Sequence, residues 1–111
     1  MATNSDKIID IKKKDDGTKV VFSKEYDFEG KKIKEVDLKG LDDLTANDLI
    51  KANKVFTTNG NVATVPEITL EYAIILAASV THLPIEFYEQ LISKDILKVK
   101  NRVVNFLYGE E

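Results

Sequence analysis

Hydrophobic residues follow a two-residue period before Gly40 and a helical period after it. The first extended segment runs from Val20 to Phe28, and its apolar side chains fall on one face of a strand because successive residues point to opposite faces. These side chains belong to Val20, Phe22, Tyr26 and Phe28. The pattern therefore predicts a strand with one covered face.

A hairpin is expected to follow this strand. Glu29-Gly30 suits a tight turn because glycine tolerates the positive φ that hairpins demand. Residues 32–38 then return as the partner strand, with Ile33 on the face opposite Val36 unless a bulge intervenes. A third segment, residues 7–11, also has strand character, and an Asp15-Asp16-Gly17 turn separates it from the hairpin.

Four helices are predicted after Gly40. Thr45 and Asp48 have the spacing of a helix amino-terminal cap, and the polar residues 57–61 predict a loop after this first helix. Pro66 is expected to open a long second helix that ends near residues 81–82. Pro84 opens a short helix through Gln90, and the last helix is capped by Ser93 and stopped by Gly109, with Asp95 complementing its amino end.

The second helix contains a run, residues 72–80, that is apolar around its whole circumference. Such a helix must be surrounded by protein. We therefore expect it at the centre of the core, with four side chains nearly fully buried: Tyr72, Ile75, Leu76 and Val80. The predicted fold class is α+β, in which a small amino-terminal antiparallel sheet of two or three strands precedes a bundle of about four helices.

The predicted domain organisation is one domain, residues 1–111, because a chain of this length supports one core. Residues 1–16 form an edge strand or a flexible segment, residues 17–40 the hairpin, and residues 41–109 the helical part.

The last helix has more apolar surface than one core requires. At 100° per residue its apolar residues span an arc of about 200°. They form two stripes: Phe106, Val99, Val103, Ile96 and Leu107 in the first, and Leu97, Val104 and Tyr108 in the second. A helix on one core needs about half that arc. The second stripe is therefore a candidate contact for a partner or another copy; the alternative is that it is buried in a groove between the sheet and the central helix.

Phe87 and Tyr88 on the short helix present a similar choice. Adjacent residues of a helix point in different directions, so we expect one of the two to be more exposed. They are the second candidate partner-binding pair.

Composition and charge reduce the number of possible function classes. A net charge of −3 supplies no overall attraction to nucleic acid or to anionic lipid, and no apolar run is long enough to span a bilayer. The clusters Lys12–Lys14 and Lys31–Lys32 are flanked by acids, which favours solvated strand ends over a phosphate site. The amino terminus lacks a secretory signal pattern, so a cytoplasmic location is expected.

Catalytic chemistry is not expected. The chain has one histidine, His82, no cysteine and no glycine-rich phosphate-binding turn. His82 lies at a predicted helix end, where a capping or exposed position needs no function. We therefore expect no catalytic residues, no cofactor and no metal.

Several segments together resemble a known family. They are YDFEGKKI (26–33), VDLKGLDDLTANDLI (36–50), LEYA (70–73), LPIEF (83–87) and DILKVKNRVVNFL (95–107). In this order and spacing they are similar to tail assembly chaperones of long-tailed bacteriophages and prophages. The resemblance runs from about Tyr26 to Gly109.

The resemblance implies a non-enzymatic protein of the bacterial host cytoplasm that binds the tape measure protein and keeps it soluble while the tail tube assembles. It implies absence from the mature virion. A longer frameshifted form, in such systems, recruits the tail tube protein, and self-association into an oligomer is a further expectation. Two alternatives remain: a minor structural or completion protein of the phage tail, and a small nucleic-acid-binding regulator, which the acidic composition disfavours.

Overall fold

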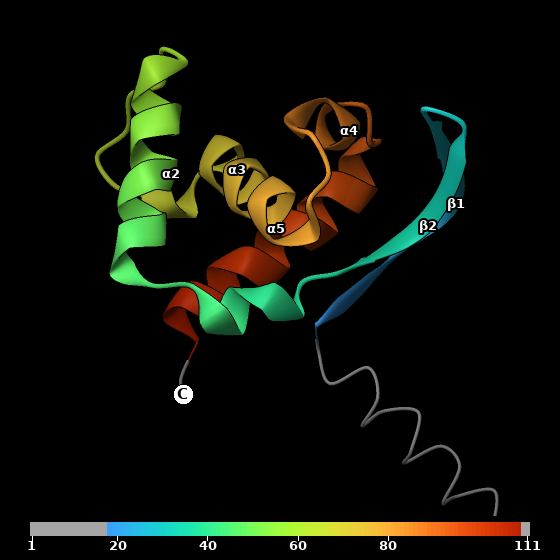
Figure 1. The fold of residues 1–111 in the computed structure, drawn as a ribbon, viewed down its shortest axis with the longest axis horizontal. Helices are drawn as coiled ribbons and strands as arrows, with labels where there is room; N and C mark the ends of the chain where they lie inside the picture. Colours follow the sequence, from blue (N-terminus) through green and yellow to red (C-terminus); the bar gives the residue numbers. More distant parts are fainter. Residues whose placement is uncertain (1–17, 110–111) are drawn as a thin grey trace, which may run out of the picture.

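A computed structural model of the protein describes residues 18–109. Over these residues the fold is α+β, as predicted, with a two-stranded antiparallel sheet followed by four α-helices. Figure 1 shows α3 in the middle of the helices, with α2 on one side and the hairpin on the other. The predicted strand at residues 7–11 and the turn at residues 15–17 lie outside the described part of the chain.

The hairpin consists of β1 (Lys19–Phe28) and β2 (Lys31–Asp37). Its turn residues Glu29 and Gly30 have positive φ angles of 50° and 84°, so the predicted use of glycine is confirmed. The register shifts between Val21 and Tyr26, so that Tyr26 pairs with Ile33. This irregularity brings Ile33 against the core despite its odd spacing from Val36.

A 3₁₀ helix, η1 (Lys39–Asp43), connects the sheet to α2 (Ala46–Thr58). The predicted cap is present: the Thr45 hydroxyl accepts from the Asp48 backbone N–H, and the Asp48 carboxylate accepts from the Thr45 backbone N–H at 2.9 Å. The helix continues two residues into the segment predicted to be a loop, to Thr58.

The central helix begins later than predicted. Pro66 opens only a short 3₁₀ turn, η2 (Pro66–Ile68), and α3 spans Leu70–Thr81. Thr69 is extended, and its hydroxyl accepts a hydrogen bond from the Tyr72 backbone N–H at 3.2 Å. A side-chain cap of this kind starts a helix by satisfying a free amide, which sets the start of α3 at Leu70.

The apolar run of α3 forms the centre of the core. All residues from Tyr72 to Ala77 are buried, which confirms the placement of Tyr72, Ile75 and Leu76. The prediction for Val80 is wrong, because this side chain is half-buried. Val80 lies near the end of α3 against η1, where a Cβ added to Gly40 would come within 3.0 Å of the Val80 Cβ.

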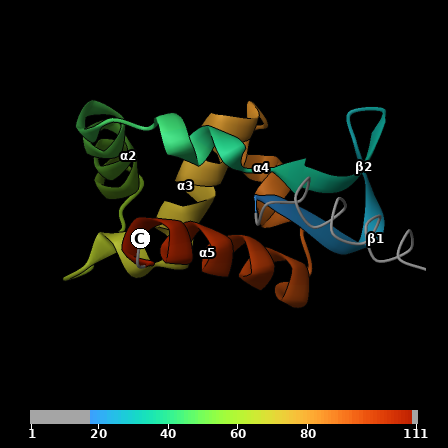
Figure 2. The same cartoon turned by 90° about the horizontal axis from the view of Figure 1, so that it is seen from below.

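Two helices complete the fold, α4 (Ile85–Glu89) and α5 (Ser93–Tyr108). Ser93 is the first residue of α5 and does not cap it; the cap position is Ile92, with no side-chain hydrogen bond. Gly109 ends the helix as predicted. Figure 2 shows α5 running along one side of the molecule, with the hairpin near one end of the helix and α2 towards the other.

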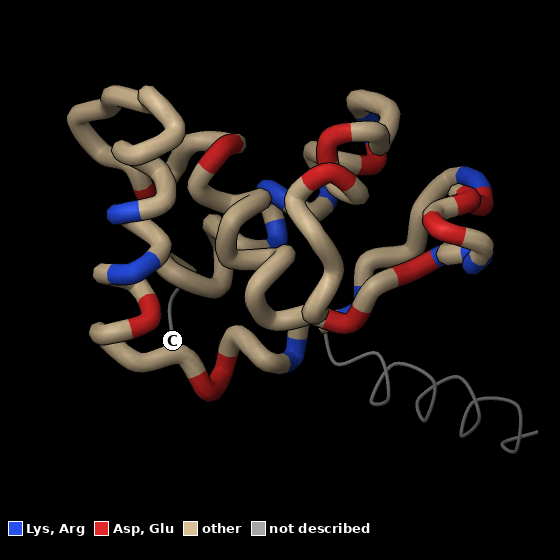
Figure 3. Tube along the Cα trace, turned by 45° about the horizontal axis from the view of Figure 1, so that its top comes forward, with Lys and Arg blue, Asp and Glu red and all other residues tan. Residues whose placement is uncertain are grey.

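Charges of both signs are mixed on the hairpin, as Figure 3 shows near its tip. Lys31 and Lys32 lie at the start of β2, and the Lys32 ammonium pairs with the Asp27 carboxylate at 2.8 Å. This cluster is therefore a solvated strand end, as its acidic neighbours indicated.

Candidate partner-binding surface

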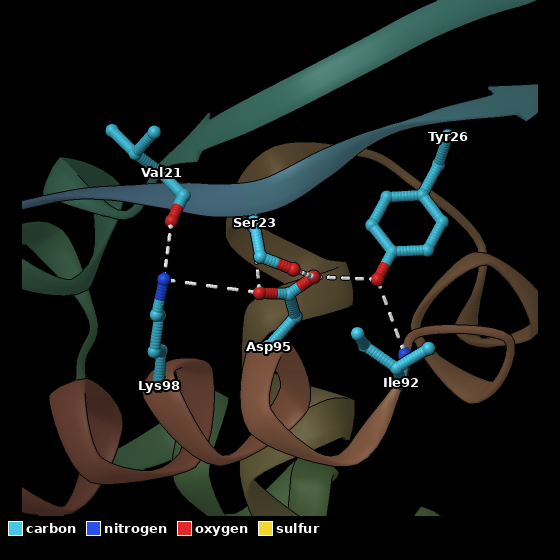
Figure 4. A network of polar contacts seen from close by, with 6 residues as sticks. All are labelled: Val21, Ser23, Tyr26, Ile92, Asp95 and Lys98. Atoms are coloured by element: carbon cyan, nitrogen blue, oxygen red, sulfur yellow. Dashed lines mark hydrogen bonds and ion pairs between the residues drawn. The ribbon is translucent and has the colours of Figure 1, made fainter.

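A buried carboxylate joins α5 to the sheet. Asp95 has no exposed surface, and it accepts hydrogen bonds from the Ser23 backbone N–H at 2.8 Å and the Ser23 hydroxyl at 3.0 Å. The Tyr26 hydroxyl donates to Asp95 at 2.5 Å and accepts from the Ile92 backbone N–H at 3.2 Å. Figure 4 shows this network between β1 and the first turns of α5.

The network keeps Asp95 ionised. Burial by itself would raise the pKa of the carboxyl, but hydrogen bonds from Tyr26 and Ser23 and the nearby Lys98 ammonium bring it below its ordinary value. The pKa of Tyr26 is raised, first by burial and then by its hydrogen bond to Asp95. A buried charge with several donors is stable only while all of them stay in place.

Two basic side chains of α5 cover the outer edge of β1. The Lys98 ammonium donates to the Val21 carbonyl at 2.9 Å, and the Arg102 guanidinium donates to the Lys19 carbonyl at 3.0 Å. Unpaired carbonyls at a sheet edge attract other strands, so these contacts protect the edge. Together with Asp95 and the buried residues Val99 and Val103, they orient α5 so that Leu97 and Tyr108 face outward.

The second stripe of α5 lies on the outward side. Leu97 is 45% exposed, Tyr108 is 56% exposed, and Val104 is half-buried between them. On the opposite side, Val99 and Val103 are completely buried. The structure therefore places Leu97, Val104 and Tyr108 at the surface of the single chain; their contact with a partner stays a prediction.

The expectation that Phe106, a member of the first stripe of α5, packs against the core is wrong. Phe106 is 42% exposed and lines a shallow cleft of about 290 Å³ between η1 and the end of α5, opposite Leu38 and Leu41. After Val103 no described residue of α5 is fully buried. The helical period alone predicted burial for Phe106, but the last turns of α5 extend past the densely packed part of the core.

The second candidate pair is not available at the surface. Phe87 and Tyr88 are both completely buried, so the expectation that one of them is more exposed is wrong. The Phe87 ring packs edge-on against Phe28 and Tyr88, with ring centres 5.5 and 5.1 Å away. The Tyr88 hydroxyl lies 2.7 Å from the Thr81 hydroxyl of α3. Since α4 has the hairpin on one side and α3 on the other, both residues reach the core.

Sequence reasoning assigned Asp95 to the helix amino end and missed its partners. Asp95 does lie in the first turn of α5, but it also lies one helical turn before Val99, on the buried side of the helix. A carboxylate in line with core valines needs donors from another element. That spacing was visible in the sequence; the identity of the donors, Ser23 and Tyr26, was not.

Comparison with protein-family models, with curated proteins and with solved structures returns no match for this chain. Between residues 18 and 109, no three His, Cys, Asp or Glu side chains come together in a way that could hold a metal ion. None of the helices in the same residues is both long and apolar enough to cross a membrane.

Proposed function

We propose that this chain is a non-enzymatic tail assembly chaperone of a long-tailed bacteriophage or prophage, which binds the tape measure protein and keeps it soluble during tail tube assembly. The observation that carries the proposal is the outward stripe of α5, with Leu97 45% and Tyr108 56% exposed. Side chains of this kind, left in water by a folded chain, are suited to hold an apolar segment of another protein. The resemblance of residues 26–109 to such chaperones supplies the class of partner.

Binding by this stripe would be reversible and would need no cofactor. Burying apolar surface gives a non-directional attraction, which suits a chaperone that holds many similar segments of one long helical protein. The protein would act in the cytoplasm of the bacterial host and leave the tail before the virion is complete. A longer frameshifted form would add contacts with the tail tube protein.

Co-expression tests this proposal. The cognate tape measure protein is produced alone and together with this chain, and its soluble fraction is measured after centrifugation. We expect most of it to be soluble only in the presence of this chain. Equal solubility in both cases would refute the proposal.

Mass spectrometry of purified particles separates the proposal from its main alternative. A chaperone is absent from finished tails, whereas a minor structural or completion protein is present in fixed copy number. Detection of this chain in washed, mature particles would favour the structural role.

A further inference from the structure

The charged side chains of α5 are mostly basic. The helix carries four basic residues and one acid, Asp95, which is completely buried. Two of the basic residues, Lys98 and Arg102, bind carbonyls of β1. The other two are Lys94, which is exposed, and Lys100, which is half-buried. Within residues 18–109 neither has an ion pair or side-chain hydrogen bond, so their charges remain for another molecule.

These two lysines border the apolar stripe on its two sides. At 100° per residue, Lys94 and Lys100 lie about 60° to either side of Leu97 around the helix axis. The stripe itself, Leu97, Val104 and Tyr108, extends about 16 Å along α5 at 1.5 Å per residue. A straight apolar row with a cation on each side is the complement of a helix that has an apolar row between carboxylates.

The same charges argue against two other occupants. Pairing of this face with its own copy would bring lysines of the two helices together, because both borders are basic. An anionic membrane would attract the lysines, but a helix lying in a membrane surface needs a broad apolar face. Here the outward face of α5 exposes one apolar row, and the opposite side of the helix is buried in the protein from Ile96 to Val103.

We propose that the outward face of α5 binds an amphipathic helix of the partner whose apolar row is bordered by Asp or Glu. The apolar row supplies most of the affinity, and the lysines select the partner. That the partner is the tape measure protein rests on the function proposed above. The choice of an acidic helix rests only on this face.

Two synthetic helical peptides test the selection directly. Both carry the same row of leucines, bordered by Glu in one peptide and by Lys in the other, and their dissociation constants are measured by fluorescence anisotropy at low salt. We expect the protein to bind the Glu-bordered peptide about three- to tenfold more tightly, because each surface ion pair contributes little by itself. A salt concentration of about 1 M should reduce the ratio of the two dissociation constants but leave most of the affinity for each peptide.

Charge reversal supplies the matched control. In the Lys94→Glu/Lys100→Glu variant the preference should invert, whereas Lys51→Glu/Lys54→Glu, which makes the same change on exposed positions of α2, should keep the wild-type preference. The Leu97→Ser/Tyr108→Ser variant should bind both peptides more weakly. Vesicles with an anionic lipid surface should bind the protein no better than neutral vesicles.

Four results would overturn the proposal: no binding of either peptide, equal binding of both, an unchanged preference after charge reversal of α5, or a preference for anionic vesicles. Each can occur whether or not the chain keeps the tape measure protein soluble. Failure of this inference is therefore distinguishable from failure of the proposed function.

Discussion

α3 and α5 pack against each other, but the protein surrounds them differently. α3 is covered on every side along Tyr72–Ala77, whereas α5 is covered on one side and exposes Leu97 and Tyr108 on the other. Packing along the apolar run holds α3, and the hydroxyls of Tyr72 and Thr81 add hydrogen bonds to α2 and α4. The rotation of α5 is fixed by polar contacts from Asp95, Lys98 and Arg102 to β1. A helix held in this way can keep an apolar row in water.

The largest effect is expected in α3. Leu76 is 1% exposed, so Leu76→Ala should lower the free energy of unfolding by about 2 to 5 kcal/mol through lost contacts and a cavity. Denaturant unfolding followed by circular dichroism measures this. The control is Ile50→Ala on the exposed side of α2, which should change stability by less than about 0.5 kcal/mol. Similar values for the two variants would show that α3 is not the centre of the core.

A smaller loss is expected at the junction of α5 and β1. Asp95→Ala leaves the Ser23 backbone N–H and the Tyr26 hydroxyl without their acceptor, which should lower the free energy of unfolding by about 1 to 3 kcal/mol. Removal of one donor in Tyr26→Phe should have a smaller effect. If Asp95→Ala is as stable as the wild type, the network does not hold the helix.

Acid sensitivity checks the same junction. The pKa of Asp95 is lower in the folded protein than in the unfolded chain, so its contribution is present above about pH 4 and is lost as the pH falls through the folded-state value. The stability of Asp95→Asn, which cannot be protonated there, should therefore fall less steeply in acid. Parallel acid curves for the two proteins would contradict the assigned pKa direction.

Alkaline titration probes the packing of α4 against α3. Burial raises the pKa of Tyr88 to about 12, an effect that the Thr81 hydrogen bond partly offsets. Since the pKa in the unfolded chain is about 10, this contribution to stability is complete below pH 10 and is lost as the pH rises towards 12. Ultraviolet absorbance of tyrosinate should show a late-ionising group that Tyr88→Phe removes. If the signal lost in that variant is that of a group ionising near pH 10, Tyr88 is accessible to solvent.

The smallest effect on stability is expected on the outward row of α5. Replacing exposed side chains rarely changes the free energy of unfolding by more than about 0.5 kcal/mol, so Leu97→Ser/Tyr108→Ser should keep a thermal midpoint close to wild type. Differential scanning fluorimetry measures it. Cooperative unfolding at a much lower temperature would place this row inside the core.

Much of the fold could be predicted from local pattern. The capping pair Thr45 and Asp48, the turn at Gly30 and the apolar run of α3 depend on neighbours in sequence, and all three are present. The late start of α3 has a local cause, the cap at Thr69, whereas the errors in burial originate in tertiary contacts. Phe87 and Tyr88 are both buried because two elements enclose α4, and Phe106 is exposed because the core ends before the helix does.

The candidate surface was predictable in part. The period of α5 defined the second row but left open whether it is exposed or buried in a groove; the structure leaves Leu97 and Tyr108 exposed. The polar contacts that fix the rotation of the helix come from β1, more than sixty residues away along the chain. Such contacts leave no periodic signal. The role proposed for Lys94 and Lys100 depends on the contacts of Lys98 and Arg102 with the sheet, which the sequence does not indicate.

The most direct test of the account is the soluble fraction of the tape measure protein co-expressed with Leu97→Ser/Tyr108→Ser. The matched control is Val21→Ser/Ile50→Ser, which removes two apolar side chains that are exposed to a similar degree on β1 and α2. We predict that the α5 variant loses most of the solubilising effect at an unchanged thermal midpoint, while the control variant keeps it. Full solubilisation by the α5 variant would contradict the assignment of this surface.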